Sequence, residues 1–204
     1  MPEEKTLSKG EQTRVAIIEA AYGLFLQNGF HGTSMRQIAE RAKLALGGIY
    51  NHFSSKEEIF AAVLDAYHPY RRILPVLDKA EGETIDEFVR DAARQIKNEI
   101  DGIEDKIMPL AFIEMVEFQG RHLAQLAKTM MPTLLNFIQR FGERRGQLRQ
   151  VPTPIVLRML FAVFVGYIMT EMVLKNVPIF KDAGYDWFDG MTDIYLHGIL
   201  EPEA

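Results

Sequence analysis

The stretch Thr33-Ser-Met-Arg-Gln-Ile-Ala-Glu-Arg-Ala42, then Lys43-Leu-Ala45, then Leu46-Gly-Gly-Ile-Tyr-Asn-His-Phe53 decides the fold of this chain. Ser34 and Gln37 have the spacing of a capping box, which predicts the start of a helix. The stretch therefore predicts a helix, a tight turn and a second, very short helix. This is the arrangement that places a recognition helix in the major groove of DNA.

Two adjacent glycines stand inside the second short helix. Gly47 and Gly48 make it a poor helix former by intrinsic propensity. Glycine lets a backbone lie against a phosphate or a base edge without a side chain between them. We interpret the pair as residues that approach DNA closely.

The flanking sequence also predicts helices. Val15, Ile18, Tyr22 and Phe25 recur at three- and four-residue steps, and Asn28-Gly29 favours the end of that helix. Strand-like alternation and hairpin signals are missing, so the expected fold class is all-α. Further helices are expected over about residues 55–67, 84–100, 106–118, 122–148 with an interruption at Pro132, 153–175 and 186–200, and Pro69 and Pro75 are expected to end or kink the first of these.

The composition is that of a globular protein and excludes several kinds of site. Of 204 residues, 48% are hydrophobic and 25% charged, and there is no cysteine. A disulfide framework, a thiol nucleophile and a cysteine-ligated metal are therefore excluded. The net charge of −5 provides no global basic field for nucleic acid, so any such role needs a local patch.

The charge divides unevenly along the chain. Residues 1–56 hold seven Lys or Arg against five Asp or Glu, and residues 57–204 hold sixteen against twenty-three. We therefore expect a small helix-turn-helix DNA-binding domain at 1–56, on a larger helical ligand-binding and dimerisation domain at 57–204.

A known pattern is matched by Thr13-Arg14, Ala20-Ala21, Leu24-Phe25, Asn28-Gly29-Phe30, Gly32-Thr33-Ser34, Ile38-Ala39, Ala42, Gly47, Tyr50, Phe53 and Ser55-Lys56-Glu57. Through these positions, residues 11–64 resemble the DNA-binding head of the TetR family of bacterial transcriptional repressors. The resemblance implies that the start of the helix at Ser34 and the cap at Lys56 contact phosphates. It also implies that the short helix after Ala45 contacts the DNA backbone and that its first residues face the base edges. The residues that this assigns to DNA are Thr33, Ser34, Arg36, Leu44, Ala45, Leu46, Gly47, Gly48, Tyr50, His52 and Lys56.

Plainer interpretations stand beside these assignments. Tyr50 is also interpretable as core, Arg36 as the partner of Glu40 one helical turn away, and His52 and Lys56 as solvated surface. A flexible arm with Lys5, Lys9 and Arg14 is expected to add contacts to DNA.

The chain departs from the family pattern at the turn and at the second helix. Lys43 replaces the turn glycine, Ala45 replaces a Ser or Thr cap, and Leu46 and Gly48 replace polar residues. Few side chains are then left for bidentate reading of bases. We expect specificity to come largely from backbone positioning and DNA shape, with Ala45 or Leu46 against thymine methyl groups.

Methionine and phenylalanine in the larger domain suggest an adaptable apolar cavity. Plain core accounts for the same spacing, whereas the resemblance implies a pocket for a small-molecule effector. The candidate lining residues are Tyr67, Met108, Phe112, Met115, Phe118, Met130 and Phe137.

The segment Met159–Thr170 holds twelve uncharged residues, fewer than the roughly 20 that a membrane span needs. We expect a buried helix that packs with Trp187, Met191, Ile194 and Tyr195 in a four-helix homodimer interface, as the resemblance also implies. The start of the chain lacks the features of a signal peptide, so a cytoplasmic location and no membrane partner are expected.

The expected function is a ligand-responsive regulator, a repressor released from a palindromic operator in double-stranded DNA by a small, largely apolar effector. One alternative is a helical ligand-binding or scaffold protein with a degenerate head. Another is a carboxylate-bundle enzyme, against which stands a lone Asp65-x-x-His68 without any Glu-x-x-His. No catalytic residue, metal or cofactor is expected.

A basic cluster consists of Arg140, Arg144, Arg145 and Arg149. We interpret these residues as favourable charges at a helix C-terminus, with an anionic ligand such as an acyl-CoA as the alternative.

Overall fold

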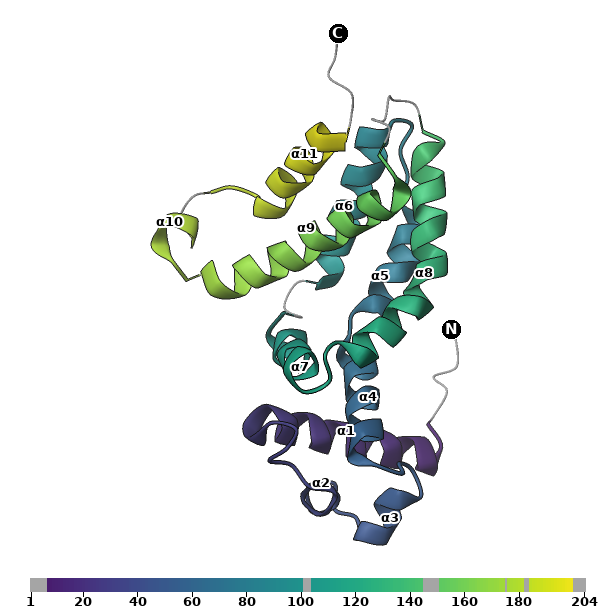
Figure 1. Ribbon diagram of the computed structural model, residues 1–204, viewed down its shortest axis with the longest axis vertical. Coiled ribbons are helices and arrows are strands. Elements are labelled where there is room, and N and C mark those ends of the chain that lie inside the picture. Colours follow the sequence, from purple (N-terminus) through teal and green to yellow (C-terminus); the bar gives the residue numbers. More distant parts are fainter. Residues whose placement is uncertain (1–6, 101–103, 145–150, 175, 182–183, 200–204) are drawn as a thin grey trace. The chain divides into compact units, whose positions relative to one another are not determined.

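The computed structural model describes residues 7–100, 104–144, 151–174, 176–181 and 184–199 (Figure 1). Within these ranges the chain forms eleven helices and no strand, which confirms the all-α prediction. The helices are α1 Lys9–Asn28, α2 Met35–Arg41, α3 Leu46–Tyr50, α4 Lys56–Tyr67, α5 Tyr70–Lys79, α6 Ile85–Ile100, α7 Glu104–Glu117, α8 Arg121–Gly142, α9 Thr153–Leu174, α10 Pro178–Lys181 and α11 Trp187–Ile199.

Proline shapes two of these helices differently from expectation. Pro69 caps α5 at its start and Pro75 lies inside it, so the two prolines bound a helix that the sequence pattern did not predict. Pro132 lies inside α8 without ending it. Short α10 was not predicted either. Lys5, Arg145 and Arg149 lie outside the described residues.

The chain divides into two compact units. The head unit comprises residues 1–68 and 106–126, and the body unit comprises residues 69–105 and 127–204. The head unit extends beyond residue 56 because α4 packs on α1 and buries Ile59, Phe60 and Val63. The predicted boundary thus falls at the first residue of α4 rather than between the compact units.

Aromatic side chains form the core of the head unit. The ring of Phe60 lies 5.4 Å from Phe25, 5.6 Å from Phe30 and 4.8 Å from Phe118. Burying a phenylalanine side chain stabilises a fold by about 1.5–3 kcal/mol. Since Phe118 directly follows α7, this burial fixes the end of α7 within the head unit.

A buried carboxylate joins α7 to the start of α8. Glu114 is fully buried, and its carboxylate accepts hydrogen bonds from the backbone N–H of His122 at 2.6 Å and of Leu123 at 3.3 Å. The Nδ1 atom of His122 lies 2.8 Å from the same carboxylate. Negative charge is favourable at a helix N-terminus, so Glu114 caps α8.

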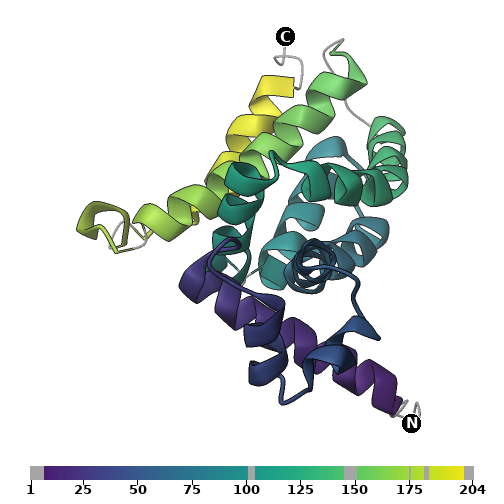
Figure 2. The same ribbon diagram turned by 60° about the horizontal axis from the view of Figure 1, so that its bottom comes forward.

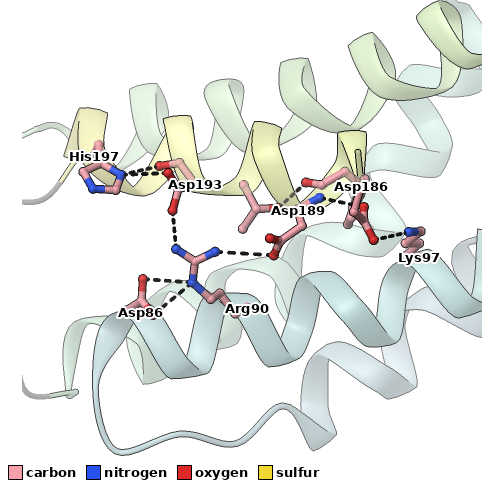
Figure 3. Close-up of polar contacts among 9 residues, drawn as sticks. Asp86, Arg90, Lys97, Asp186, Asp189, Asp193 and His197 are labelled. Atoms are coloured by element: carbon pink, nitrogen blue, oxygen red, sulfur yellow. Dashed lines mark hydrogen bonds and ion pairs between the residues drawn. The ribbon is translucent and has the colours of Figure 1, made fainter. Parts of the chain in front are cut away.

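A set of ion pairs ties α6 to α11 in the body unit (Figure 3). The Arg90 guanidinium contacts Asp86 on its own helix at 3.0 Å and reaches Asp189 at 3.4 Å and Asp193 on α11. Lys97 adds a contact of 2.5 Å to Asp186. Hydrogen bonds from Arg90 hold the pKa of Asp193 below its usual range.

Basic residues at the end of α8 donate hydrogen bonds to backbone carbonyls, including those at the end of α5. Arg140 donates hydrogen bonds to the carbonyls of Leu77 at 3.0 Å, Asp78 at 2.8 Å and Ala80 at 2.5 Å. Arg140 therefore caps the C-terminus of α5, which satisfies carbonyls that have no partner inside that helix. Arg144 donates to the carbonyl of Arg140.

Helix α9 is largely uncovered in the single chain. Ile168 is its one buried residue, whereas Ile155, Met159, Phe161 and Val173 are exposed. It runs beside α11 in the body unit (Figures 1 and 2). Helix α9 has 22 residues and a mean hydropathy of up to 1.8, so it is long and apolar enough to cross a membrane. Core helices of soluble proteins can have the same length and hydropathy. The structure describes a single chain, so the predicted burial of α9 in a homodimer interface stays a prediction.

Candidate nucleic-acid interface

A capping box and a left-handed turn set the geometry of α2 and α3. The Ser34 hydroxyl accepts a hydrogen bond from the backbone N–H of Gln37 at 3.2 Å, and the Gln37 side chain accepts one from the Ser34 N–H at 2.8 Å. Lys43 has a φ of 58°, and the next residue, Leu44, donates its N–H to the carbonyl of Ala39 at 2.9 Å. The predicted box is confirmed, and the left-handed turn explains why glycine suits position 43.

The start and outer face of α3 are exposed. Leu46 is 43% and Tyr50 is 53% exposed, whereas Ile49 between them is fully buried. Ile49 therefore anchors α3 to the head core and Tyr50 points to solvent, so the alternative interpretation of Tyr50 as core is wrong. Ala45, at the N-cap position, is also exposed and makes no side-chain capping hydrogen bond.

The two glycines of α3 are not required by packing against any residue that the structure describes. A Cβ atom on Gly47 or Gly48 would meet no atom within 4 Å, and neither residue has a left-handed φ. Gly32 is different, because a Cβ there would lie 2.2 Å from the carbonyl oxygen of Asn28. The fold thus requires glycine at position 32, while positions 47 and 48 have open space beside them.

Two of the residues assigned to DNA are engaged inside the protein. Thr33 is 1% exposed, and its hydroxyl donates towards the carbonyls of Gly29 at 2.9 Å and Leu24 at 3.2 Å. The Lys56 ammonium donates to the carbonyls of Phe30 at 2.5 Å and Thr33 at 2.6 Å. These side chains hold the loop before α2 in place, and a phosphate contact by either residue stays a prediction.

Burial has a second effect on Lys56. Its ammonium lies 4.2 Å from the centroid of the Phe30 ring. Desolvation lowers the pKa of Lys56, although the charge of Glu117 opposes the shift. Both observations describe a cation that is held by the loop. These contacts of Lys56 could not be predicted from local sequence, because the partners are backbone atoms more than twenty residues away.

Arg36, His52 and Ser34 remain at or near the surface. Arg36 pairs with Glu40 at 3.0 Å, as the plainer interpretation predicted, and both side chains are largely exposed. Exposed pairs of this kind contribute about 0–1 kcal/mol, so Arg36 can exchange its partner for a phosphate at little cost. His52 and Leu44 are half-buried, and Ser34 is exposed.

Arg14 supports α3 from α1. Its guanidinium donates to the carbonyl of His52 at 3.3 Å and lies 4.1 Å from the centroid of the Phe53 ring. Arg14 therefore belongs to helix α1 and not to a flexible arm, and Lys9 is the first residue of that helix. Arg14 is a residue that sequence reasoning placed wrongly, because α1 begins earlier than the apolar pattern indicated.

The seven candidate effector residues are divided between the two units. In the head unit, Met108 and Phe118 are buried core, and Phe112 and Met115 are exposed. Tyr67 stacks on Tyr22 with ring centroids 3.9 Å apart. The two remaining candidates lie in the body unit, where Phe137 stacks on Phe88 and Met130 is half-buried.

A pocket of about 480 Å³ lies elsewhere in the body unit. Its lining includes Tyr167 and Glu171 from α9, Phe180 from α10, and Tyr185 and Trp187 at the start of α11. None of the seven predicted residues lines it. The signal that sequence reasoning missed is the aromatic-rich segment 180–187, together with the helical spacing of Tyr167, Glu171 and Leu174.

Comparisons with known proteins bear on both units. The family described as bacterial regulatory proteins, tetR family, matches residues 17–63. The "Probable HTH-type transcriptional regulator ArpR" of Pseudomonas putida is 33% identical over 195 residues, which are 94% of this chain and 84% of that protein.

Two solved structures share the helical fold. SmeT, the repressor of the Stenotrophomonas maltophilia multidrug efflux pump SmeDEF, has a TM-score of 0.64 and 23% identity over 95% of this chain and 93% of that chain. NalD, the secondary repressor of the MexAB-OprM multidrug efflux pump in Pseudomonas aeruginosa, has a TM-score of 0.64 and 21% identity over 97% of this chain and 100% of that chain.

Proposed function

The chain belongs to the TetR family of bacterial transcriptional regulators and is not an enzyme. From this premise we propose that it is a repressor bound to a palindromic operator. The repressor leaves the operator when a small organic effector binds its body unit. The observation that carries the proposal is the exposed, glycine-containing face of α3, for which the fold itself gives no reason.

The proposed DNA contacts follow from the exposure of each residue. Gly47 and Gly48 let the backbone of α3 approach the major groove closely. Ala45 and Leu46 offer apolar contact to thymine methyl groups, and Tyr50 reaches the sugar-phosphate backbone. Phosphate contacts come from Ser34 and Arg36 at the start of α2, and Leu44 and His52 border the same face.

Dimerisation supplies the second head. Exposed apolar residues follow α9 and α11, among them Phe161 at 67% and Ile194 at 75% exposure. Exposed apolar side chains gathered on two helices are typical of interaction sites. A two-fold dimer that buries it would present two heads to two half-sites, which is why the operator is proposed to be palindromic.

Release by an effector requires that the ligand favours the form that does not bind DNA. Coupling of about 1–3 kcal/mol, typical of allosteric proteins, would lower operator affinity roughly 5- to 150-fold. Two of the relatives are named as repressors of multidrug efflux pumps, which supports an organic effector for this chain also. A cytoplasmic location accompanies the proposal, because the operator lies there.

Selection of genomic fragments tests the proposal. The wild-type chain should enrich one palindromic site, and Tyr50→Ala should lose that enrichment while keeping its oligomeric state. Binding should also weaken with salt by about 0.9 log units per phosphate contact for each tenfold rise in salt.

A second function is favoured by one observation. The exposed residues at the start of α3, Ala45 to Gly47, carry no side chain capable of bidentate base recognition. A folded chain that enriches no site at either salt concentration would favour a helical ligand-binding protein with a degenerate head.

A further inference from the structure

The body-unit pocket is built largely from aromatic rings. Trp187 lies 5.6 Å from Phe180 and 5.7 Å from Tyr185 between ring centroids, with interplanar angles of 55° and 67°. The indole N–H donates to the carbonyl of Phe180 at 3.3 Å, which fixes the orientation of Trp187. In such tilted pairs the edge of one ring meets the face of its neighbour, so the rings are not stacked face to face.

One carboxylate stands among these rings. Glu171 is the charged residue in the lining, and it forms no hydrogen bond or ion pair with any residue that the structure describes. The neighbouring Thr170 hydroxyl is occupied by the carbonyls of Gly166 at 2.7 Å and Tyr167 at 3.0 Å. A bound cation would give this half-buried carboxylate an ionic contact inside the pocket.

We propose that this pocket binds an organic cation whose ammonium group carries apolar substituents. The ammonium would lie near Glu171 and against the faces of Trp187 and Tyr185, because aromatic faces attract cations. Quaternary ammonium groups suit such sites, since they carry charge without needing hydrogen bonds. The volume of about 480 Å³ is within the usual range for small organic ligands.

Other ligand classes fit less well. Glu171 repels an anion, and the lining provides no cationic side chain to receive one. A metal ion needs several oxygen, nitrogen or sulfur ligands, and the described residues contain no group of three such acidic or histidine side chains. A neutral apolar molecule would fill the volume but make no ionic contact with the Glu171 carboxylate.

The inference deepens the proposed function, because it names the chemical class of the effector, and its regulatory consequence rests on that function. Binding of the organic cation to the pocket does not depend on that function. Cation binding without release of DNA would leave the site in place and contradict its role in regulation, whereas absent binding would contradict the site alone.

Trp187 makes the test direct, since it is the single tryptophan of the chain and lines the pocket. Its fluorescence is titrated with phenyltrimethylammonium and, separately, with tert-butylbenzene, which has the same shape without the charge. We expect the cation to bind at least about tenfold more tightly, because cation–π contacts and a carboxylate act only on the cation. Equal affinities, or no response to either probe from the folded chain, would overturn the proposal.

A matched pair of variants locates the charge effect. Glu171→Gln keeps the shape of the side chain and should remove most of the preference for the cation, while binding of tert-butylbenzene stays unchanged. Glu143→Gln makes the same chemical change at the residue that directly follows α8, outside the pocket lining, and should behave as wild type. Circular dichroism checks that both variants are folded. Retained cation preference in folded Glu171→Gln would contradict the assignment of Glu171.

Discussion

Gly48→Ala separates what α3 does for the fold from what it does for DNA. Glycine inside a helix costs about 0.5–1 kcal/mol relative to alanine. A Cβ at position 48 would have no neighbour within 4 Å, so alanine adds no clash that could offset this gain. The variant should therefore be more stable than the wild type.

The same methyl group should weaken DNA binding. If the α3 backbone lies against the groove, a methyl inserted there overpacks the contact, at a cost of about 1–3 kcal/mol. This corresponds to roughly a 5- to 150-fold loss of affinity. The opposite signs of the two effects are the essential feature of this prediction.

Two measurements check it. Thermal unfolding should show a melting temperature higher by about 1–4 °C, since one kcal/mol shifts a protein of this size by about 2–4 °C. Fluorescence anisotropy with a labelled operator fragment measures affinity at fixed salt. Gly142→Ala is the matched control. Gly142 is the last residue of α8 in the body unit, and a Cβ atom there would also meet no atom within 4 Å.

The reasoning is refuted by either of two results. Unchanged operator affinity in Gly48→Ala would mean that the glycine does not serve close approach to DNA. Lower stability would mean that the fold requires glycine at position 48. Gly142→Ala should keep full affinity, and a parallel loss in that control would point to a general effect of helix stabilisation.

Three further changes test the head and body units. Lys43→Gly should stabilise the chain by about 1 kcal/mol in urea unfolding, because Lys43 has a φ of 58°, and an equal gain in Lys43→Ala would refute the backbone explanation. Arg90→Met should destabilise by about 1–3 kcal/mol, because it leaves three carboxylates together without their cation, and unchanged thermal unfolding would count against this network. Burial lowers the pKa of His68 to about 4 from an ordinary 6.5, so the unfolded chain binds the proton first and stability should fall by at most about 3 kcal/mol as pH drops from 6.5 to 4. His68→Gln should flatten that part of the pH dependence, and an unaltered slope would show that other groups cause it.

Local signals predicted the local structure of the head well. The spacing of Ser34 and Gln37 is sufficient to define a capping box, because both partners lie within one helical turn. The ion pair of Arg36 with Glu40 was foreseen for the same reason. Expectations that depend on three or four residues along one helix do not need the tertiary fold.

Contacts between residues far apart in the sequence could not be predicted from local patterns. Lys56 binds two carbonyls of a loop more than twenty residues earlier, and Thr33 is buried by the packing of α1. Phe118 has the spacing of a pocket residue, but it packs against Phe30 and Phe60. Apolar periodicity favours burial without securing it, since Phe112 and Met115 are exposed, and it does not distinguish a core from a ligand pocket.

The most direct measurement of the central claim is a hydroxyl-radical footprint of the wild-type chain on its selected operator. The account predicts two symmetry-related protected half-sites, separated by about 34–36 Å or a multiple of it, and no protection by Tyr50→Ala. A single protected segment without symmetry, or the same footprint from Tyr50→Ala, would contradict it.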